Sequence, residues 1–158
     1  MRYVRRVLQP GETIVYATTL HWVVYFRTIL LLIVCVILAA AAVSTSDNQN
    51  ISLALGIAAV IFALLALSAG LRAFIRRMAT ELAVTDHRVI YKSGLLSRHT
   101  IEMNRDKVES VDVDQTLIGR IFGYGTVIVR GTGGSLEPMR NIGDPLSFRS
   151  HITASTAT

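Results

Sequence analysis

Residues 28–71 read TILLLIVCVILAAAAVSTSDNQNISLALGIAAVIFALLALSAGL, and this stretch decides the fold. It contains two uncharged apolar runs, residues 28–46 and 48–71, which are separated by Asp47. A helix needs roughly 20 apolar residues to cross a bilayer core about 30 Å thick, and each run is long enough. The polar segment 44–50 between the runs is too short to hold a domain. The sequence therefore predicts a hairpin of two transmembrane helices, over residues 22–44 and 50–74.

Basic residues flank this hairpin and are absent from its turn. Because basic residues beside short membrane segments stay in the cytoplasm, we expect both termini on the cytoplasmic side of a multi-pass membrane protein. Trp22 and Tyr25 fall where an interfacial aromatic belt is expected. The arginines nearest the membrane are expected to touch anionic lipid headgroups: Arg27, Arg72, Arg76 and Arg77.

The net charge of the chain is +5, and all of it lies around the hairpin. Residues 1–77 carry seven arginines and two acidic residues, whereas residues 78–158 carry nine basic and nine acidic residues. A nucleic-acid-binding domain needs a basic face, and the balanced second part has no excess charge to form one. We therefore expect membrane lipids, and no nucleic acid, as partners.

A cleaved signal peptide is the alternative interpretation of the first apolar run, because the alanines at 39–41 resemble a small-residue cleavage site. About 27 residues precede the run, whereas the basic segment of a signal peptide is short. A membrane helix is therefore the favoured interpretation.

Small residues recur every three or four positions along the second apolar run. This spacing places them on one helix face, where they allow two helices to approach closely. The face would lie within the hairpin or between protomers, unless it only reflects the abundance of alanine in membrane helices. Neither apolar core has an ionisable side chain, which argues against a transporter or proton channel. The small residues of this seam are Gly56, Ala59, Ala63, Ala66 and Gly70.

After Arg77 the apolar pattern changes to a period of two, which is typical of strands. Strands are expected at 81–85, 88–92, about 95–102, 108–114, 126–130 and about 136–140, with a tight hairpin turn at Asp86-His87. Asp144 and Pro145 open a helix that ends near Ile152. The predicted parts are an N-terminal segment 1–19 with a possible extra strand at 13–18, the hairpin 20–77, a β domain 78–153 and a flexible tail 154–158.

Several motifs carry a resemblance to a known family. They are LQPGE at 8–12, LAVTDHRV at 82–89, VESV at 108–111 and RIFGYGTV at 120–127. With these motifs the chain resembles the bacterial pleckstrin-homology (PH)-like membrane proteins of the YdbS type, the bacterial PH domain type 2 family. The resemblance implies an α+β membrane protein of the bacterial inner (plasma) membrane, with a PH-like antiparallel split β-barrel capped by a C-terminal helix. It implies no general biochemical activity. His87 stands where the family's turn favours Arg or Asn, which implies a weaker basic site.

Two groups of residues are candidate interaction sites. Basic residues near the hairpin loops would bind a lipid headgroup, or would belong to a solvated face of mixed charge: His87, Arg88, Lys92, Arg98, Arg105 and Lys107. The segment LIGRIF at 117–122, with Ile121 and Phe122, would dip into the membrane, bind a partner or plug the end of the barrel. The plug is the commonest role of such a turn and is the favoured one.

No motif indicates catalysis. The four histidines are scattered, there is no HExxH and no cysteine cluster, and the glycine-rich segment 131–135 lacks the Lys and Ser/Thr of a phosphate-binding loop. We expect no catalytic residue, no metal and no cofactor. The sequence predicts a non-catalytic scaffold that presents a PH-like domain to a protein partner or a second copy. The alternatives are an accessory subunit docked through the hairpin and a sensor of anionic lipid headgroups.

Overall fold

The computed structural model describes residues 3–94, 99–132, 134–135 and 138–154. The chain divides into a β unit, Met1–Val23 with Arg76–Thr158, and a helical unit, Val24–Ile75. The beginning of the strand expected at 95–102, with Arg98, and the end of the tail, 155–158, lie outside the described residues.

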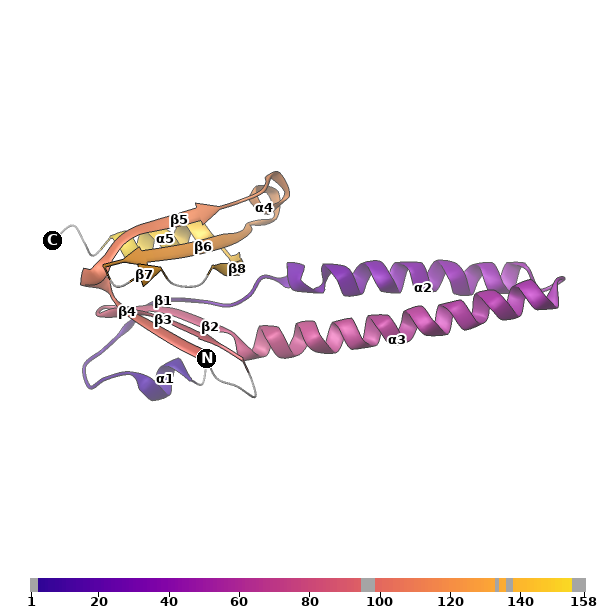
Figure 1. Ribbon diagram of the computed structural model, residues 1–158, viewed down its shortest axis with the longest axis horizontal. Helices are drawn as coiled ribbons and strands as arrows, with labels where there is room; N and C mark the ends of the chain where they lie inside the picture. The colour runs from indigo at the N-terminus through magenta and orange to yellow at the C-terminus, as the bar shows by residue number, and fades with distance from the viewer. Residues whose placement is uncertain (1–2, 95–98, 133, 136–137, 155–158) are drawn as a thin grey trace. The chain divides into compact units, whose positions relative to one another are not determined.

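The helical unit consists of two antiparallel helices, α2 (Phe26–Ser44) and the part of α3 (Gln49–Ala79) up to Ile75 (Figure 1). A 3-10 turn, η1 (Trp22–Tyr25), precedes α2 where the sequence predicted the helix to begin. Helix α3 continues five residues past the predicted end at 74, and the Thr80 hydroxyl donates a hydrogen bond to the Arg76 carbonyl in its last turn (2.9 Å).

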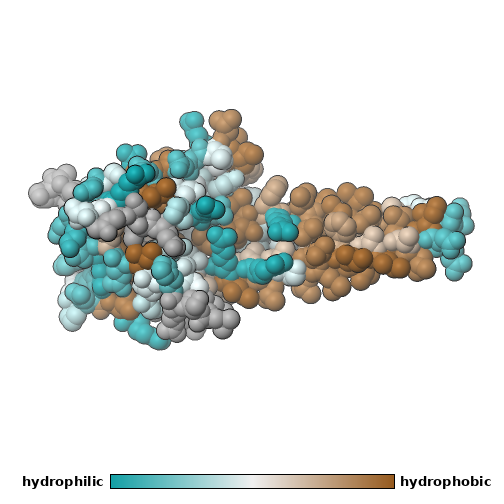
Figure 2. Space-filling view, in the orientation of Figure 1, coloured by the Kyte–Doolittle hydropathy of each residue, from teal (hydrophilic) through white to brown (hydrophobic). Residues whose placement is uncertain are grey.

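Both helices are long and apolar enough to cross a membrane, and little of either is buried in protein. Only 6% of the apolar window of α2 and 11% of that of α3 is buried. In Figure 2 hydrophobic side chains cover both helices, and hydrophilic ones gather at the turn that joins them. The core helix of a soluble protein would be mostly buried, so these helices expose an apolar surface that needs a cover.

The β unit contains two antiparallel four-stranded sheets. The first has the order β1 (Ile14–Thr18), β2 (Glu81–Thr85), β3 (Arg88–Ser93) and β4 (His99–Asn104). In the second, β6 (Tyr124–Gly131) pairs with β5 (Val108–Asp114) on one side and with β7 (Gly134–Ser135) and β8 (Met139–Gly143) on the other. The predicted β2–β3 hairpin is confirmed. Two short strands stand where one was expected near 136–140.

The predicted barrel is not closed. Among the described residues, one isolated bridge, between Leu20 and Ile142, joins the two sheets at one corner. At the other corner the chain passes from β4 to β5 through a 3-10 turn, η2 (Arg105–Lys107), and no ladder pairs these two strands in the described part of the chain. The turn consumes the residues that a continuous strand would need, so the sheets face each other as two layers (Figure 1).

The main core lies between the sheets and is completed by α5 (Pro145–Thr153). The C-terminal helix is confirmed: the Asp144 carboxylate accepts a hydrogen bond from Ser147 N (3.3 Å), and Pro145 occupies the first turn. Phe148 and Ile152, four residues apart, are both buried in this core. The strands contribute the other core side chains, among them Leu82, Val84, Val89, Val127, Val129 and Ile142.

A short helix that the sequence did not indicate, α1 (Val4–Val7), covers the outer face of the first sheet. Val4 is buried there with Ala83 and Ile90. The Glu81 carboxylate accepts hydrogen bonds from Tyr3 N and Val4 N (both 3.1 Å), which satisfies amides at the start of the helix. Strand β2 is therefore buried on both of its faces.

Candidate functional site

A polar cleft of about 410 Å³ lies beside the β2–β3 hairpin turn. Its lining includes His87 and Arg88, which are candidate headgroup-binding residues. The turn is held against the start of β1, because Asp86 Oδ1 accepts from Thr13 N and Asp86 N donates to Thr13 O (both 3.1 Å). We call this the hairpin cleft; its lining residues are Gln9, Asp86, His87, Arg88, Asn104 and Asp106.

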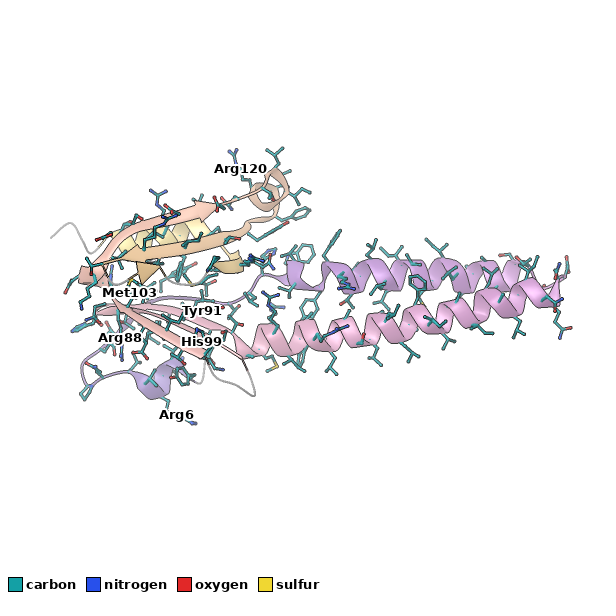
Figure 3. All side chains as sticks on the ribbon, in the orientation of Figure 1. Arg6, Arg88, Tyr91, His99, Met103 and Arg120 are labelled. Atoms are coloured by element: carbon teal, nitrogen blue, oxygen red, sulfur yellow. The ribbon has the colours of Figure 1, made fainter. Side chains whose placement is uncertain are left out.

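Only 13% of the Arg88 side chain is exposed, and Figure 3 labels its place in the β unit. Its guanidinium forms two hydrogen bonds to the Glu12 carboxylate, from Nε (2.9 Å) and Nη2 (2.8 Å). It also donates to the Glu102 carboxylate (2.6 Å) and to the Val7 carbonyl (2.8 Å). All three guanidinium nitrogens are thus used within the protein, so Arg88 has little capacity left for a phosphate.

Glu12 is held in place by the turn Gln9-Pro10-Gly11-Glu12. Gly11 has a φ of +88°, which glycine tolerates and which a type II turn requires after proline. Gln9 N donates to the Glu12 carboxylate (2.8 Å), and Glu12 N donates to the Gln9 carbonyl (3.0 Å). The Thr85 hydroxyl adds a third type of donor to the carboxylate (2.7 Å). The turn was predictable as part of the LQPGE motif at 8–12, but no local pattern indicated that Glu12 would be a buried acid.

The electrostatics follow from this geometry. The hydrogen bonds from Arg88 lower the pKa of Glu12 to about 2, against the opposing effect of burial. The same contact with Glu12 raises the pKa of Arg88. Both groups are therefore charged at neutral pH, and each neutralises the other inside the domain.

We expect the β unit to lose stability in acid because of Glu12. Its pKa is lower in the folded protein, so the stabilisation is complete above the ordinary value of about 4.5 and is lost as the pH falls from there towards 2. The shift corresponds to about 3 kcal/mol. Urea unfolding of the full chain in detergent, followed by emission of the single Trp22, should show this loss between pH 6 and pH 2.5. Glu12→Gln should flatten the dependence and exposed Glu109→Gln should not; equal profiles for both would contradict the assignment.

Arg105 is a second basic residue that the fold uses internally. It is buried, and it donates hydrogen bonds to the carbonyls of Thr85 (3.0 Å), His151 (2.6 Å) and Ile152 (3.1 Å). Two of these carbonyls belong to the last turn of α5, where a cation is favourable. Arg105 therefore joins the end of α5 to β2 and does not face a ligand.

None of the other candidate residues that the structure describes gives the cleft a basic surface. His87 is exposed and lies 3.0 Å from the Asp86 carboxylate, and Lys107 is exposed on η2. Lys92 is buried under the ring of Tyr3. Asp86 and Asp106 contribute carboxylates to the lining. The hairpin cleft is thus polar and of mixed charge, which does not favour a phosphorylated headgroup.

The segment 117–122 forms a short helix, α4 (Leu117–Phe122), and the expectation that it plugs the barrel is wrong. Its four large apolar side chains, Leu117, Ile118, Ile121 and Phe122, are 52–79% exposed, whereas Gly119 is buried. A Cβ on Gly119 would lie 2.6 Å from the Tyr124 carbonyl. The helix therefore packs against the start of β6 through Gly119, and its apolar side chains point outward.

The small-residue seam packs within the helical unit. Ala59 and Ala66 are buried, and a Cβ on Gly70 would lie 3.2 Å from the Thr28 methyl group. Hydrogen bonds cross the same face, from the Cys35 thiol to the Ala59 carbonyl (3.3 Å) and from the Ser52 hydroxyl to the Ala42 carbonyl (2.8 Å). Ala63 is half-buried. Gly56 differs, since a Cβ there would meet nothing within 4 Å.

The arginines expected at the membrane surface have exposed side chains: Arg27, Arg72, Arg76 and Arg77. Arg72 also donates to the Ser68 carbonyl (3.1 Å) one turn earlier. Partial burial lowers the pKa of His21, and the charge of Arg77 lowers it further. No group of three or more His, Cys, Asp or Glu side chains that could hold a metal occurs among the described residues.

Comparison with known proteins gives one family match. The model of a family described as "Bacterial PH domain" matches residues 14–156. The matched region begins with β1, runs through α2 and α3, and includes both sheets and α5. No curated protein and no solved structure matches the chain.

Proposed function

The chain belongs to the bacterial PH domain family, as its sequence predicted, and on that premise we propose that it is a non-catalytic scaffold anchored in the bacterial inner membrane. Its α2–α3 hairpin would cross the membrane, and its β unit would present a protein-interaction surface on the cytoplasmic side. PH domains often bind lipids or proteins and are generally non-catalytic.

The observation that carries the proposal is the exposed apolar surface of the hairpin. Side chains such as Val36, Leu53 and Leu67 are 64–70% exposed on helices that contain no charged residue over 28–46 and 48–71. Exposing this surface to water costs roughly 25 cal/mol for each Å², so it requires a membrane or a protein cover. The length of both helices suits a bilayer core about 30 Å thick.

The arginines support an orientation with both termini in the cytoplasm. Arg27 and Arg72 lie at corresponding ends of the two apolar runs, and Arg76 and Arg77 follow one turn later. The turn at 45–50 has no basic residue. Basic residues near an anionic membrane surface contribute about 1 kcal/mol each, which favours keeping this end of the hairpin on the cytoplasmic side.

Protein interaction is favoured over headgroup sensing because of how the β unit uses its basic residues. Arg88 and Arg105 are satisfied by protein acceptors, and the hairpin cleft contains two aspartates. A phosphate would have to displace Glu12 or lie beside Asp86 and Asp106. The cost of either arrangement makes the anionic-lipid sensor the weakest of the candidate functions.

An accessory subunit of a larger membrane complex is the second candidate. A groove of about 840 Å³ opens on the hairpin beside Gly56, where the absence of a side chain leaves room for another helix. The groove is predominantly apolar, and its lining comes from both helices: Ala42, Val43, Ser46, Ser52, Leu53, Gly56, Ile57, Val60 and Ile61.

Two cysteine variants test the membrane topology. Asp47→Cys and Ser150→Cys, each in a Cys35→Ser background, place one thiol in the α2–α3 turn and one in α5. In right-side-out vesicles we expect an impermeant maleimide to label position 47 and not position 150, and in inverted vesicles the reverse. Release of the chain by alkaline carbonate, or labelling of both positions from one side, would refute the anchor.

Gentle detergent extraction followed by mass measurement tests the scaffold role. A homo-oligomer or a complex with a soluble partner is expected for a scaffold, whereas a fixed complex with other membrane helices would favour the accessory subunit. A lone protomer at every concentration would contradict both functions. The full chain in vesicles should bind a phosphorylated headgroup no more tightly than its Lys107→Met and His87→Ala variants do.

A further inference from the structure

The β unit carries an exposed apolar projection, α4, that its own core does not use. Leu117 and Ile121 are 77% and 79% exposed, and Ile118 and Phe122 are also more than half exposed. Four large apolar side chains on six consecutive residues form a continuous apolar tip, which is unusual on a small domain in water.

The projection is held rigidly by the fold. The Thr116 hydroxyl accepts a hydrogen bond from Gly119 N (3.0 Å), and Gly123 ends the helix with a φ of +72° and donates to the Gly119 carbonyl. The Gln115 amide donates to the Tyr124 carbonyl on the neighbouring strand (3.1 Å). Because both ends are fixed, the outward direction of the apolar side chains is built into the backbone.

Aromatic contacts join α4 to the residue at which the apolar span begins. The rings of Trp22 and Phe122 meet edge to face at 5.8 Å, and the rings of His21 and Tyr124 stack at 5.4 Å. His21 N also donates to the Asn141 carbonyl (2.7 Å), which fixes this segment on β8. Trp22 is the first residue of the apolar span that ends at Ser44, and its side chain is itself exposed. If Trp22 lies at the membrane interface, its ring contact with Phe122 brings α4 to the same interface.

The charges around α4 suit an anionic membrane surface. No Asp or Glu occurs from Gln115 to Arg130. Arg120 is exposed on α4 between the apolar side chains, and its position is shown in Figure 3. A long basic side chain of this kind places its charge among headgroups while its stem lies on apolar surface.

We propose that α4 inserts its apolar tip into the headgroup–acyl boundary of the membrane that holds the hairpin. This inference rests on the proposed membrane anchor. Leu117, Ile118, Ile121 and Phe122 enter the boundary, Trp22 lies at the same depth, and Arg120 contacts anionic headgroups. Interfacial helices bury their apolar face by about 5–10 Å, which is within reach of a single short turn. The insertion gives the β unit a third point of attachment and fixes which of its surfaces faces the cytoplasm.

Site-specific fluorescence in vesicles tests the insertion. Three full-length variants in the Cys35→Ser background each carry one environment-sensitive thiol label: Ile121→Cys on α4, Ser150→Cys on α5 and Val36→Cys on α2. Ser150 is a matched exposed control that lies far from α4 in the β unit. Arg105 joins the last turn of α5, next to Ser150, to η2. The whole length of β5 then separates η2 from α4. Seven strand residues span roughly 23 Å. The vesicles contain phosphatidylethanolamine and phosphatidylglycerol, with or without nitroxide-labelled acyl chains.

We expect the labels at 121 and 36 to emit at shorter wavelength than the label at 150, and to be quenched by the nitroxide lipids. The label at 150 should be quenched by aqueous iodide. Leu117→Asp with Ile118→Asp should move the label at 121 from lipid quenching to iodide quenching and leave the label at 36 unchanged.

The other outcomes separate this inference from the anchor. Lipid quenching at 36 but not at 121 would refute the insertion of α4 and leave the anchor standing. Quenching by iodide at both positions would refute both proposals. Protection of position 121 from iodide and from nitroxide lipids would mean that a protein covers α4, and would equally refute its insertion.

Discussion

Arg88→Met should destabilise the β unit by about 3–5 kcal/mol. The substitution keeps much of the side-chain volume but leaves the buried Glu12 carboxylate without its cation, and removal of one partner from a buried ion pair costs about this much. Glu102 and the Val7 carbonyl lose a donor at the same time. The loss is measured as the free energy of opening of β2 and β3 amides by hydrogen exchange of the full chain in detergent micelles.

Exposed Arg149 on α5 provides the control for this experiment, and Arg149→Met should change the opening free energy by less than about 0.5 kcal/mol. The double variant Arg88→Met with Glu12→Gln should recover part of the loss, because the uncompensated charge is then absent. A loss below 1 kcal/mol in Arg88→Met would mean that the guanidinium is free to serve a ligand in the hairpin cleft. Headgroup binding would then return as a leading function.

Arg105→Met should cost about 3 kcal/mol or more and should act on a particular element. The carbonyls of Thr85, His151 and Ile152 lose a charged donor in a buried position, and each unsatisfied buried acceptor costs about 1–3 kcal/mol. Since two of these acceptors end α5, the last turn of this helix should exchange faster than the first. Hydrogen exchange of the peptide that covers α5 measures both effects.

Lys107→Met is the matched control, because Lys107 lies on the same turn, η2, and is exposed. It should leave α5 protection unchanged within about 0.5 kcal/mol. Equal effects of the two variants would contradict the role of Arg105 in joining the end of α5 to β2. If protection falls equally along α5, Arg105 stabilises the β unit as a whole and does not hold the end of α5 in particular.

Elements whose formation depends on neighbouring residues in the sequence were predictable. The β2–β3 hairpin follows from alternating apolar residues around Asp86-His87, and α5 follows from Asp144, Pro145 and two apolar residues four apart. Helix α1 was not predictable, because four residues with two arginines show no periodicity. It forms because the Glu81 carboxylate, 77 residues away, accepts from its first amides and because Ala83 and Ile90 need a cover.

The candidate site, too, was only partly predictable from the sequence. Its basic residues could be identified from their type, but their use depends on partners distant in sequence. Arg88 meets Glu12 across 76 positions, and Arg105 meets Ile152 across 47. No local pattern distinguishes a cation that faces solvent from one that neutralises a buried acid. The exposure of α4 was missed for a related reason: the plug would have needed space between the sheets, and Phe148 with Ile152 occupies that core.

The sequence by itself determined that basic residues flank two apolar helices on one side and that a part with balanced charge, residues 78–158, follows them. Hydrophobicity and charge act through composition, so these properties need no knowledge of contacts. Only the tertiary structure decided that Arg88 and Arg105 serve the fold and that α4 projects its apolar side chains beside Trp22. Burial, pairing and direction depend on which distant residues meet, and that is settled when the sheets pack.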